Sequence, residues 1–143
     1  MSRALLTREV RFSAAHRYHR PDWSEERNRT TFGPCANPHG HGHLYRLEVT
    51  VGGTVAEDTG FAVDLATLDS ILKREIVDVL DHQHINYVVA DFAPGARIPT
   101  TENLLLWMWP RVARALPAGA ELHRMLLRED EGLYAEYFGG ELP

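Results

Sequence analysis

Three histidines alternate with glycines in the run His39-Gly40-His41-Gly42-His43. Residues two positions apart on a β-strand point to the same face, so two or three of these imidazoles would project together. A further imidazole could come from His16, which we expect at the end of an adjoining strand. Three imidazoles with one open coordination position are typical of catalytic zinc, because structural zinc sites normally fill all four positions. The alternative is a surface histidine run that binds metal only adventitiously.

Groups that could transfer protons lie in two other places. Cys35, the only cysteine, comes shortly before the histidine run, where a nearby cation would stabilise its thiolate. It could equally be a buried packing residue. Asp81 and His82 are adjacent, and a carboxylate that holds an imidazole in one tautomer is a common way to tune a base. The same pair could instead lie at a helix end, with the histidine favouring the helix dipole.

Alternation of apolar and polar residues predicts the strands that must position these groups. The four predicted strands span residues 5–16, 43–54, 122–129 and 133–138. Between the two strand pairs, apolar spacings of three and four predict two helices, over residues 65–79 and 104–116. This order predicts an α+β fold, an antiparallel four-stranded sheet with two helices on one face. At 143 residues, we expect a single domain over 1–143.

Local signals refine the boundaries of these elements. Asp64 and Thr101 are placed to cap the two helices, and Pro117 is placed to end the second. Pro110 lies inside the second helical pattern, so we expect a kink or break there. Residues 17–38 show no period and are expected to form a long functional loop.

Charge and hydropathy narrow the range of partners. A formal net charge of −5 argues against a general affinity for nucleic acid, so an anionic substrate would need a local basic patch. No stretch approaches the roughly 18 consecutive apolar residues of a membrane span. Arg8 and Glu9 interrupt the amino terminus before a signal core can form. We therefore expect a cytoplasmic protein that binds neither nucleic acid nor membrane.

Five segments, in order from residue 12 to 129, resemble the signatures of the 6-pyruvoyl-tetrahydropterin synthase family. They are Phe12-Ser13-Ala14-Ala15-His16, the run from Cys35 to His43, Leu80-Asp81-His82, Pro99-Thr100-Thr101-Glu102-Asn103 and Arg128-Glu129. The resemblance covers nearly the whole chain, excepting residues 17–34. It implies a tunnelling fold (T-fold), in which subunits join their sheets into a barrel and stack as a homohexamer, a dimer of trimers.

For the metal, the resemblance implies Zn²⁺ held by three histidines, which match His16, His41 and His43. The pair His39 and His41 would also satisfy the family's His-Gly-His pattern, because the family contains two spacings between the cysteine and that pair. We prefer His41 and His43, since residues 44–51 then align with the family's strand without a gap.

For catalysis, the resemblance implies a triad of Cys35, Asp81 and His82. The cysteine would come from one subunit and the Asp-His pair from its neighbour, so active sites would be shared between subunits.

For the substrate, the resemblance implies that Glu129 anchors the pterin, assisted by Thr100, Thr101 and Glu102. A carboxylate there could accept two hydrogen bonds from the amino-pyrimidine edge of a pterin. From the residues alone, Glu129 could also be a solvated strand end, and Thr101-Glu102 could serve as a helix cap.

The expected activity is that of a zinc-dependent lyase of the carbon-oxygen class. It would convert 7,8-dihydroneopterin triphosphate to 6-pyruvoyl-tetrahydropterin with elimination of triphosphate, in tetrahydrobiopterin-type pterin biosynthesis. The alternative within the family is 6-carboxy-5,6,7,8-tetrahydropterin synthase of queuosine and deazapurine biosynthesis, a carbon-carbon lyase. A remote alternative is a non-catalytic zinc- or pterin-binding module. Cys35 precedes His41 by six positions, as in the pyruvoyl branch, which favours the first activity.

Overall fold

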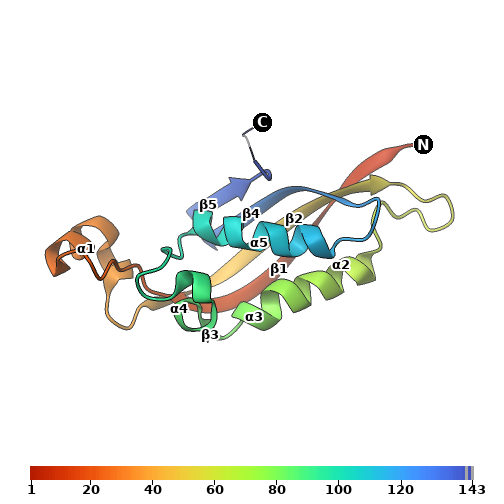
Figure 1. Ribbon diagram of the computed structural model, residues 1–143. Helices are drawn as coiled ribbons and strands as arrows, with labels where there is room; N and C mark the ends of the chain where they lie inside the picture. Colours follow the sequence, from red (N-terminus) through yellow and green to blue (C-terminus); the bar gives the residue numbers. More distant parts are fainter. Residues whose placement is uncertain (141, 143) are drawn as a thin grey trace.

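A twisted sheet covered by helices on one face forms the body of the protein, as the computed structural model shows for residues 1–140 and 142 (Figure 1). Its four longer strands are antiparallel: β1 (Arg3–His16), β2 (His41–Thr54), β4 (Glu121–Asp130) and β5 (Leu133–Tyr137). The two-residue strand β3 (Gln83–His84) pairs in parallel with β1, which gives the order β3-β1-β2-β4-β5. The predicted α+β class is confirmed. The sheet has one strand more than predicted, because β3 is only two residues long and too short to show a period in the sequence.

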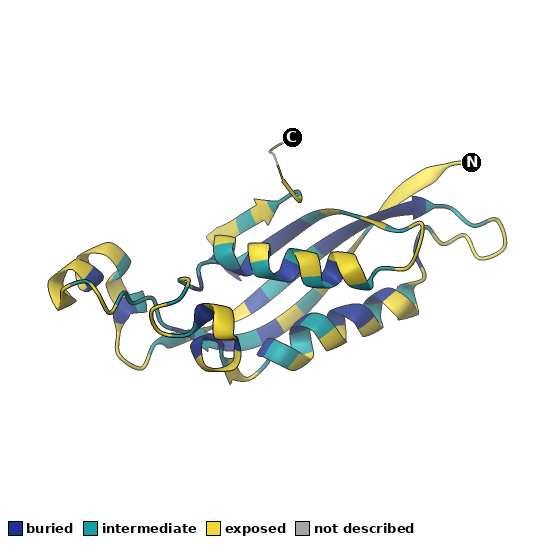
Figure 2. Cartoon of the chain, in the orientation of Figure 1, coloured by how far each residue is buried: buried dark blue, intermediate teal, exposed yellow. Residues whose placement is uncertain are grey.

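The hydrophobic core lies between the sheet and the helices. β1 and β2 pair from Arg3↔Thr54 to His16↔His41, so alternate side chains of both strands face the helices. Phe12 on β1 and Tyr45 on β2 are buried on that face, and their rings stack with centroids 4.9 Å apart. Figure 2 shows that buried residues also occupy the inner sides of the helices. The metal-binding candidates therefore continue the inward-facing rows of the core.

Two helical segments lie side by side over the sheet (Figure 1). The first is formed by α2 (Leu65–Leu72), a π-helical turn (Lys73–Val77) and α3 (Asp78–Leu80), and the second is α5 (Thr101–Ala115). The wider π-turn changes the hydrogen-bond pattern of the backbone. Arg111 of α5 donates from Nε to the carbonyl oxygen of Glu75, 3.2 Å away, and thereby ties the two segments together.

The caps of α2 and α5 agree only in part with the predicted helix boundaries. Asp64 caps α2 as predicted, accepting a hydrogen bond from the amide of Thr67 at 3.0 Å. Thr100, rather than Thr101, caps α5, because its hydroxyl accepts from the amide of Asn103 while Thr101 is already helical and buried. We expected a kink or break at Pro110, and the break is absent because α5 is continuous there. Pro110 lies on the exposed side of the helix, where water can satisfy the carbonyl that lacks a donor.

The prediction of a long loop over residues 17–38 was wrong. This segment contains α1 (Glu25–Phe32) and a 3₁₀ turn (Gly33–Ala36), and α1 protrudes from one end of the sheet (Figure 1). A polar helix without an apolar stripe gives no periodic signal. Ser24 caps α1 by accepting from the amide of Arg27, and Trp23 stacks on Phe32 with centroids 5.6 Å apart.

Shorter helical turns connect β3 to α5: α4 (Ile85–Val88) and a 3₁₀ turn (Ala90–Phe92). Across the residues described, no helix is both long and apolar enough to cross a bilayer.

Candidate metal centre and active site

His16, His41 and His43 converge where β1 ends and β2 begins. The register places His16 opposite His41 and Ala14 opposite His43, which brings all three imidazoles to the helix-covered face. The Nε2 atom of His41 lies 3.1 Å from that of His16 and 3.3 Å from that of His43. Tetrahedral zinc with bonds of about 2.0 Å requires nitrogen–nitrogen separations of about 3.3 Å. The three side chains could therefore hold one metal ion.

A hydrogen bond with Tyr45 orients the His16 ring for binding a metal. The Tyr45 hydroxyl lies 2.7 Å from Nδ1 of His16, and both residues are fully buried. This bond fixes the ring so that Nε2 faces the other imidazoles, as is usual for metal-binding histidines. Burial, followed by the charges of His43 and His41, lowers the pKa of His16 to about 3. His16 is therefore neutral at physiological pH, with a lone pair available for a metal.

His39 lies outside this cluster and is exposed. The chain bends sharply at Gly40, whose φ of +71° favours glycine and where a side chain would collide with the carbonyl oxygen of His16. Of the two possible His-Gly-His pairs, the structure brings His41 and His43 together with His16.

Cys35 lies beside the histidine cluster, on the 3₁₀ turn that precedes β2. Its Sγ atom is 3.3 Å from Nε2 of His41, and its carbonyl oxygen accepts a hydrogen bond from the amide of Tyr18. Burial and the charge of Glu129 raise the pKa of the Cys35 thiol. The protein alone thus favours the thiol, and a bound cation would supply the opposing effect.

Glu129 completes the cluster from β4. Its side chain is only 7% exposed, and Oε1 lies 3.5 Å from Nε2 of both His16 and His43. The Tyr18 hydroxyl also donates to Oε1, at 3.3 Å. Glu129 is therefore a buried carboxylate with polar neighbours, rather than a solvated strand end.

Tyr18 is a site residue that the sequence analysis missed. Its ring packs on His16 with centroids 4.5 Å apart and meets the edge of Phe32. Burial and the charge of Glu129 raise its pKa far above the usual value, so the phenol stays protonated and donates. Tyr18 lies two residues after His16, so in an extended chain both side chains point to the same side. This was the available signal, but the surrounding residues show no regular pattern and gave no reason to extend the strand.

Asp81 and His82 follow α3 and lie beside β1, where His82 and His43 line one open cleft. The Asp81 carboxylate accepts from the amide of Ser13 at 2.8 Å, and the His82 amide donates to the carbonyl of Ser13 at 2.6 Å. His82 has a φ of +59°, which is uncommon for a residue with a side chain, and that side chain is 83% exposed. Within the described part of the chain, no hydrogen bond joins Cys35 to either residue.

Thr100, Thr101 and Glu102 form the start of α5. Thr100 caps the helix, Thr101 is buried and Glu102 is exposed. The charge of Glu102 is the smallest of the contributions that raise the pKa of Tyr18. No hydrogen bond connects the three residues to Glu129 among those described.

An open cleft of about 500 Å³ adjoins the cluster, with His43 and Glu129 among its lining residues. Its volume lies within the usual range for small-molecule sites. Arg11, Arg46 and Arg128 also line it. Asp130 and Glu131 line the cleft as well, so it carries charges of both signs.

A sequence model of the family described as 6-pyruvoyl tetrahydropterin synthase (PTPS) matches residues 5–140. The chain belongs to this family. The expectation drawn from the five motifs is thereby confirmed, as is the class of pterin-biosynthetic lyases.

Similar proteins agree with this assignment over most of their length. The chain is 36% identical over 136 residues to a 6-pyruvoyl tetrahydrobiopterin synthase of Pongo abelii, which covers 95% of this chain and 92% of the relative. It is 42% identical over 113 residues to the protein of the same name from Poecilia reticulata, with coverages of 79% and 76%. The solved structure of Caenorhabditis elegans 6-pyruvoyl tetrahydropterin synthase matches with a TM-score of 0.89 at 30% identity, covering 98% of both chains.

Proposed function

We propose that this protein is a zinc-dependent 6-pyruvoyl-tetrahydropterin synthase, a carbon-oxygen lyase. It would convert 7,8-dihydroneopterin triphosphate to 6-pyruvoyl-tetrahydropterin and release triphosphate. The observation that carries the proposal is the convergence of three imidazoles beside a thiol and a buried carboxylate, in a chain that belongs to the PTPS family.

His16, His41 and His43 would hold the zinc ion. Their spacing, the neutral state of His16 and its bond to Tyr45 all suit a divalent cation with nitrogen ligands. When bound, zinc supplies Lewis acidity toward hydroxyl and carbonyl groups of the substrate side chain.

Cys35 would accept a proton from a carbon of that side chain. Its Sγ atom lies close enough to the histidine cluster to reach a substrate bound there. Asp81 and His82 would complete the triad from a neighbouring subunit. In support, His82 projects outward and has no hydrogen bond to Cys35 within the described part of its own chain. Activity would therefore require an assembled homohexamer.

Glu129 would anchor the pterin. Because Tyr18 donates to Oε1, the other carboxylate oxygen is left for the amino-pyrimidine edge of the substrate. Thr100, Thr101 and Glu102 would assist from the start of α5.

We also propose that the chain forms a single domain and works in the cytoplasm. One continuous hydrophobic cluster contains the buried residues of the sheet and helices, which supports a single domain. The free thiol of Cys35 suits a reducing compartment.

Product identification tests the proposal. The zinc-loaded protein is incubated with 7,8-dihydroneopterin triphosphate, and the products are separated and weighed by mass spectrometry. We expect 6-pyruvoyl-tetrahydropterin and triphosphate in equal amounts. A carboxylated pterin with acetaldehyde release would overturn the choice in favour of the 6-carboxy branch. The variant Cys35→Ala should still bind the substrate without releasing triphosphate; release at the wild-type rate would contradict the role of the thiol.

A further inference from the structure

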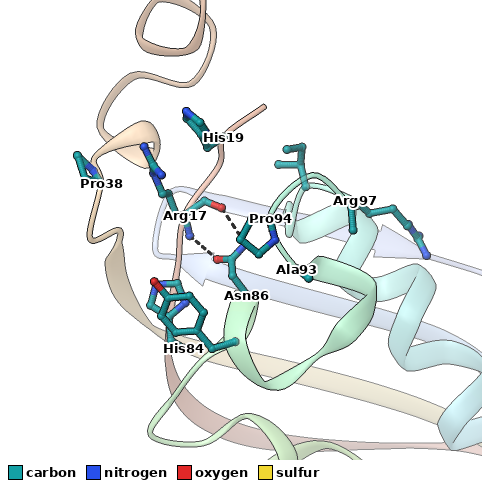
Figure 3. Close-up of a pocket in the computed structure, with 11 residues that line it drawn as sticks. Arg17, His19, Pro38, His84, Asn86, Ala93, Pro94 and Arg97 are labelled. Atoms are coloured by element: carbon teal, nitrogen blue, oxygen red, sulfur yellow. Dashed lines mark hydrogen bonds between the residues drawn. The ribbon is translucent and has the colours of Figure 1, made fainter. Parts of the chain in front are cut away.

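A small, partly open cavity of about 60 Å³ lies beside the segment that follows His16 (Figure 3). Its walls come from the residues after β1, the start of α4 and the loop that leads to α5. The residues that matter for its chemistry are Arg17, His19, His84 and Asn86. It is distinct from the open cleft lined by His43 and Glu129.

Asn86 holds the walls of this cavity in place. Its Oδ1 atom accepts from the amide of Arg17 at 2.7 Å, and its Nδ2 atom donates to the carbonyl oxygens of Arg17 and Phe92 at 3.1 and 2.9 Å. The two bonds to Arg17 appear as dashed lines in Figure 3. A buried amide with all these partners rigidifies the segments it joins. The cavity is therefore a preformed feature of the fold.

The lining is basic. Arg17, His19, His84 and Arg97 contribute to it, and no carboxylate lines it within residues 1–140 and 142. Arg97 adds mainly its stem, since Figure 3 shows its guanidinium leading away from the other labelled residues. In a chain of net charge −5, this concentration of cationic and imidazole groups is a local exception.

Two imidazole nitrogens at this cavity lack a hydrogen-bond partner among the described residues: Nε2 of His19 and Nδ1 of His84. Both atoms are buried, and leaving such atoms unpaired costs free energy. Nε2 of His19 lies 3.6 Å from the carboxylate of the exposed Glu25, beyond hydrogen-bond distance. His84 is held by stacking on Tyr87, with ring centroids 4.3 Å apart. Each nitrogen becomes a donor when it carries the proton.

Arg17 adds a permanent charge to the lining of the cavity. Its Nε atom donates to the carbonyl oxygen of Ala36 at 3.2 Å, and this bond fixes the side chain. Its two terminal nitrogens have no protein acceptor among the described residues and remain able to donate. An arginine and two imidazoles around one small space match the acceptor oxygens of an anion.

We propose that this cavity binds an oxyanion of the size of one phosphate group. The volume of about 60 Å³ is roughly twice the share of one water molecule in the liquid, which gives room for one phosphate group. Arg17, His19 and His84 are the donors, and Asn86 keeps the cavity open. The phosphate group has two possible sources: free inorganic phosphate, or the end of the substrate's triphosphate. The second source rests on the function proposed above.

Isothermal titration of the zinc-loaded protein with inorganic phosphate tests the site, at fixed ionic strength. Wild type is compared with His84→Gln and His19→Gln, and with His123→Gln as a matched control, because His123 is an exposed histidine away from this cavity. We expect saturable binding to wild type and to the control. Loss of one charge-assisted hydrogen bond should weaken binding about tenfold in each cavity variant. No saturable binding, or equal dissociation constants in all four proteins, would overturn the proposal.

Thermal unfolding and zinc content first establish that each variant is folded and metal-loaded. If one cavity variant fails this check, the other still tests the site. Steady-state kinetics then distinguish the sources. If the phosphate belongs to the substrate, His84→Gln raises KM for 7,8-dihydroneopterin triphosphate about tenfold and leaves the binding of phosphate-free dihydroneopterin unchanged. If it is free phosphate, KM is unchanged and phosphate still binds in the presence of substrate. The phosphate titration decides the site even if the protein turns over no pterin.

Discussion

Removing the Tyr45 hydroxyl should weaken metal binding while leaving the fold intact. A metal on Nε2 of His16 requires the proton of that imidazole to be on Nδ1, and Nδ1 lies 2.7 Å from the Tyr45 oxygen. The tyrosine oxygen therefore accepts this bond in the metal-bound protein. In Tyr45→Phe the ring still stacks on Phe12, but a polarised N–H is left buried without a partner.

The magnitude follows from comparing the metal-bound and metal-free proteins. A hydrogen bond from an imidazole polarised by a cation contributes about 1.5–3 kcal/mol, against about 1 kcal/mol for the neutral bond without metal. The difference of about 0.5–2 kcal/mol corresponds to a zinc affinity about 2- to 30-fold lower, and we expect a value near tenfold. The metal-free variant should also lose about 1 kcal/mol of unfolding free energy.

Competition with a chromophoric zinc chelator measures this affinity, and urea unfolding of the metal-free proteins measures stability. Tyr134→Phe is the control, because Tyr134 is an exposed tyrosine on β5 and its hydroxyl has no hydrogen bond within the described residues. The control should match wild type in both experiments. A zinc affinity of Tyr45→Phe equal to that of wild type would show that this bond does not orient His16, and the reasoning would fail.

Three further predictions concern the same centre. His43→Ala should lose tightly bound zinc while His39→Ala retains it, and full zinc in His43→Ala by elemental analysis would refute the ligand assignment. Tyr18→Phe should raise the dissociation constant for dihydroneopterin several-fold at unchanged zinc content, because Glu129 loses the donor that orients it; unchanged pterin affinity by calorimetry would contradict this. The metal-free protein should lose stability as pH falls from 6.5 toward 3, because the unfolded chain protonates His16 first. The pKa of His16 is about 3 in the folded protein, so the loss of unfolding free energy reaches about 4 kcal/mol near pH 3.5. An unfolding free energy that does not change with pH in denaturant titrations would contradict this prediction.

The convergence of the histidines was predictable from the sequence because strands have a strict period of two. Once His41 and His43 lie on a strand beside the end of β1, their parity puts them on one face, and a slip of one residue would turn both away from His16. The same regularity made the four long strands predictable. Helices with a clear apolar stripe, such as α5, were predictable for the same reason.

Features without a period were missed or misplaced. α1 is polar on most of its surface, so its sequence lacks an apolar stripe and resembles that of a loop. The helix is defined instead by its cap and by the stacking of Trp23 on Phe32. The contact of Tyr18 with Glu129 joins residues 111 positions apart, and nothing local records it. Similarly, the hydrogen bond of Asp81 to Ser13 is tertiary, and it holds the Asp-His pair beside β1.

Zinc dependence of turnover tests the central claim most directly. The purified protein is stripped of metal with a chelator and dialysed, and triphosphate release from 7,8-dihydroneopterin triphosphate is measured before and after stepwise addition of zinc. We predict that activity disappears with the metal and returns in proportion to zinc bound, reaching its maximum at one ion per histidine cluster. Full activity in a sample shown by elemental analysis to contain no metal would contradict the account.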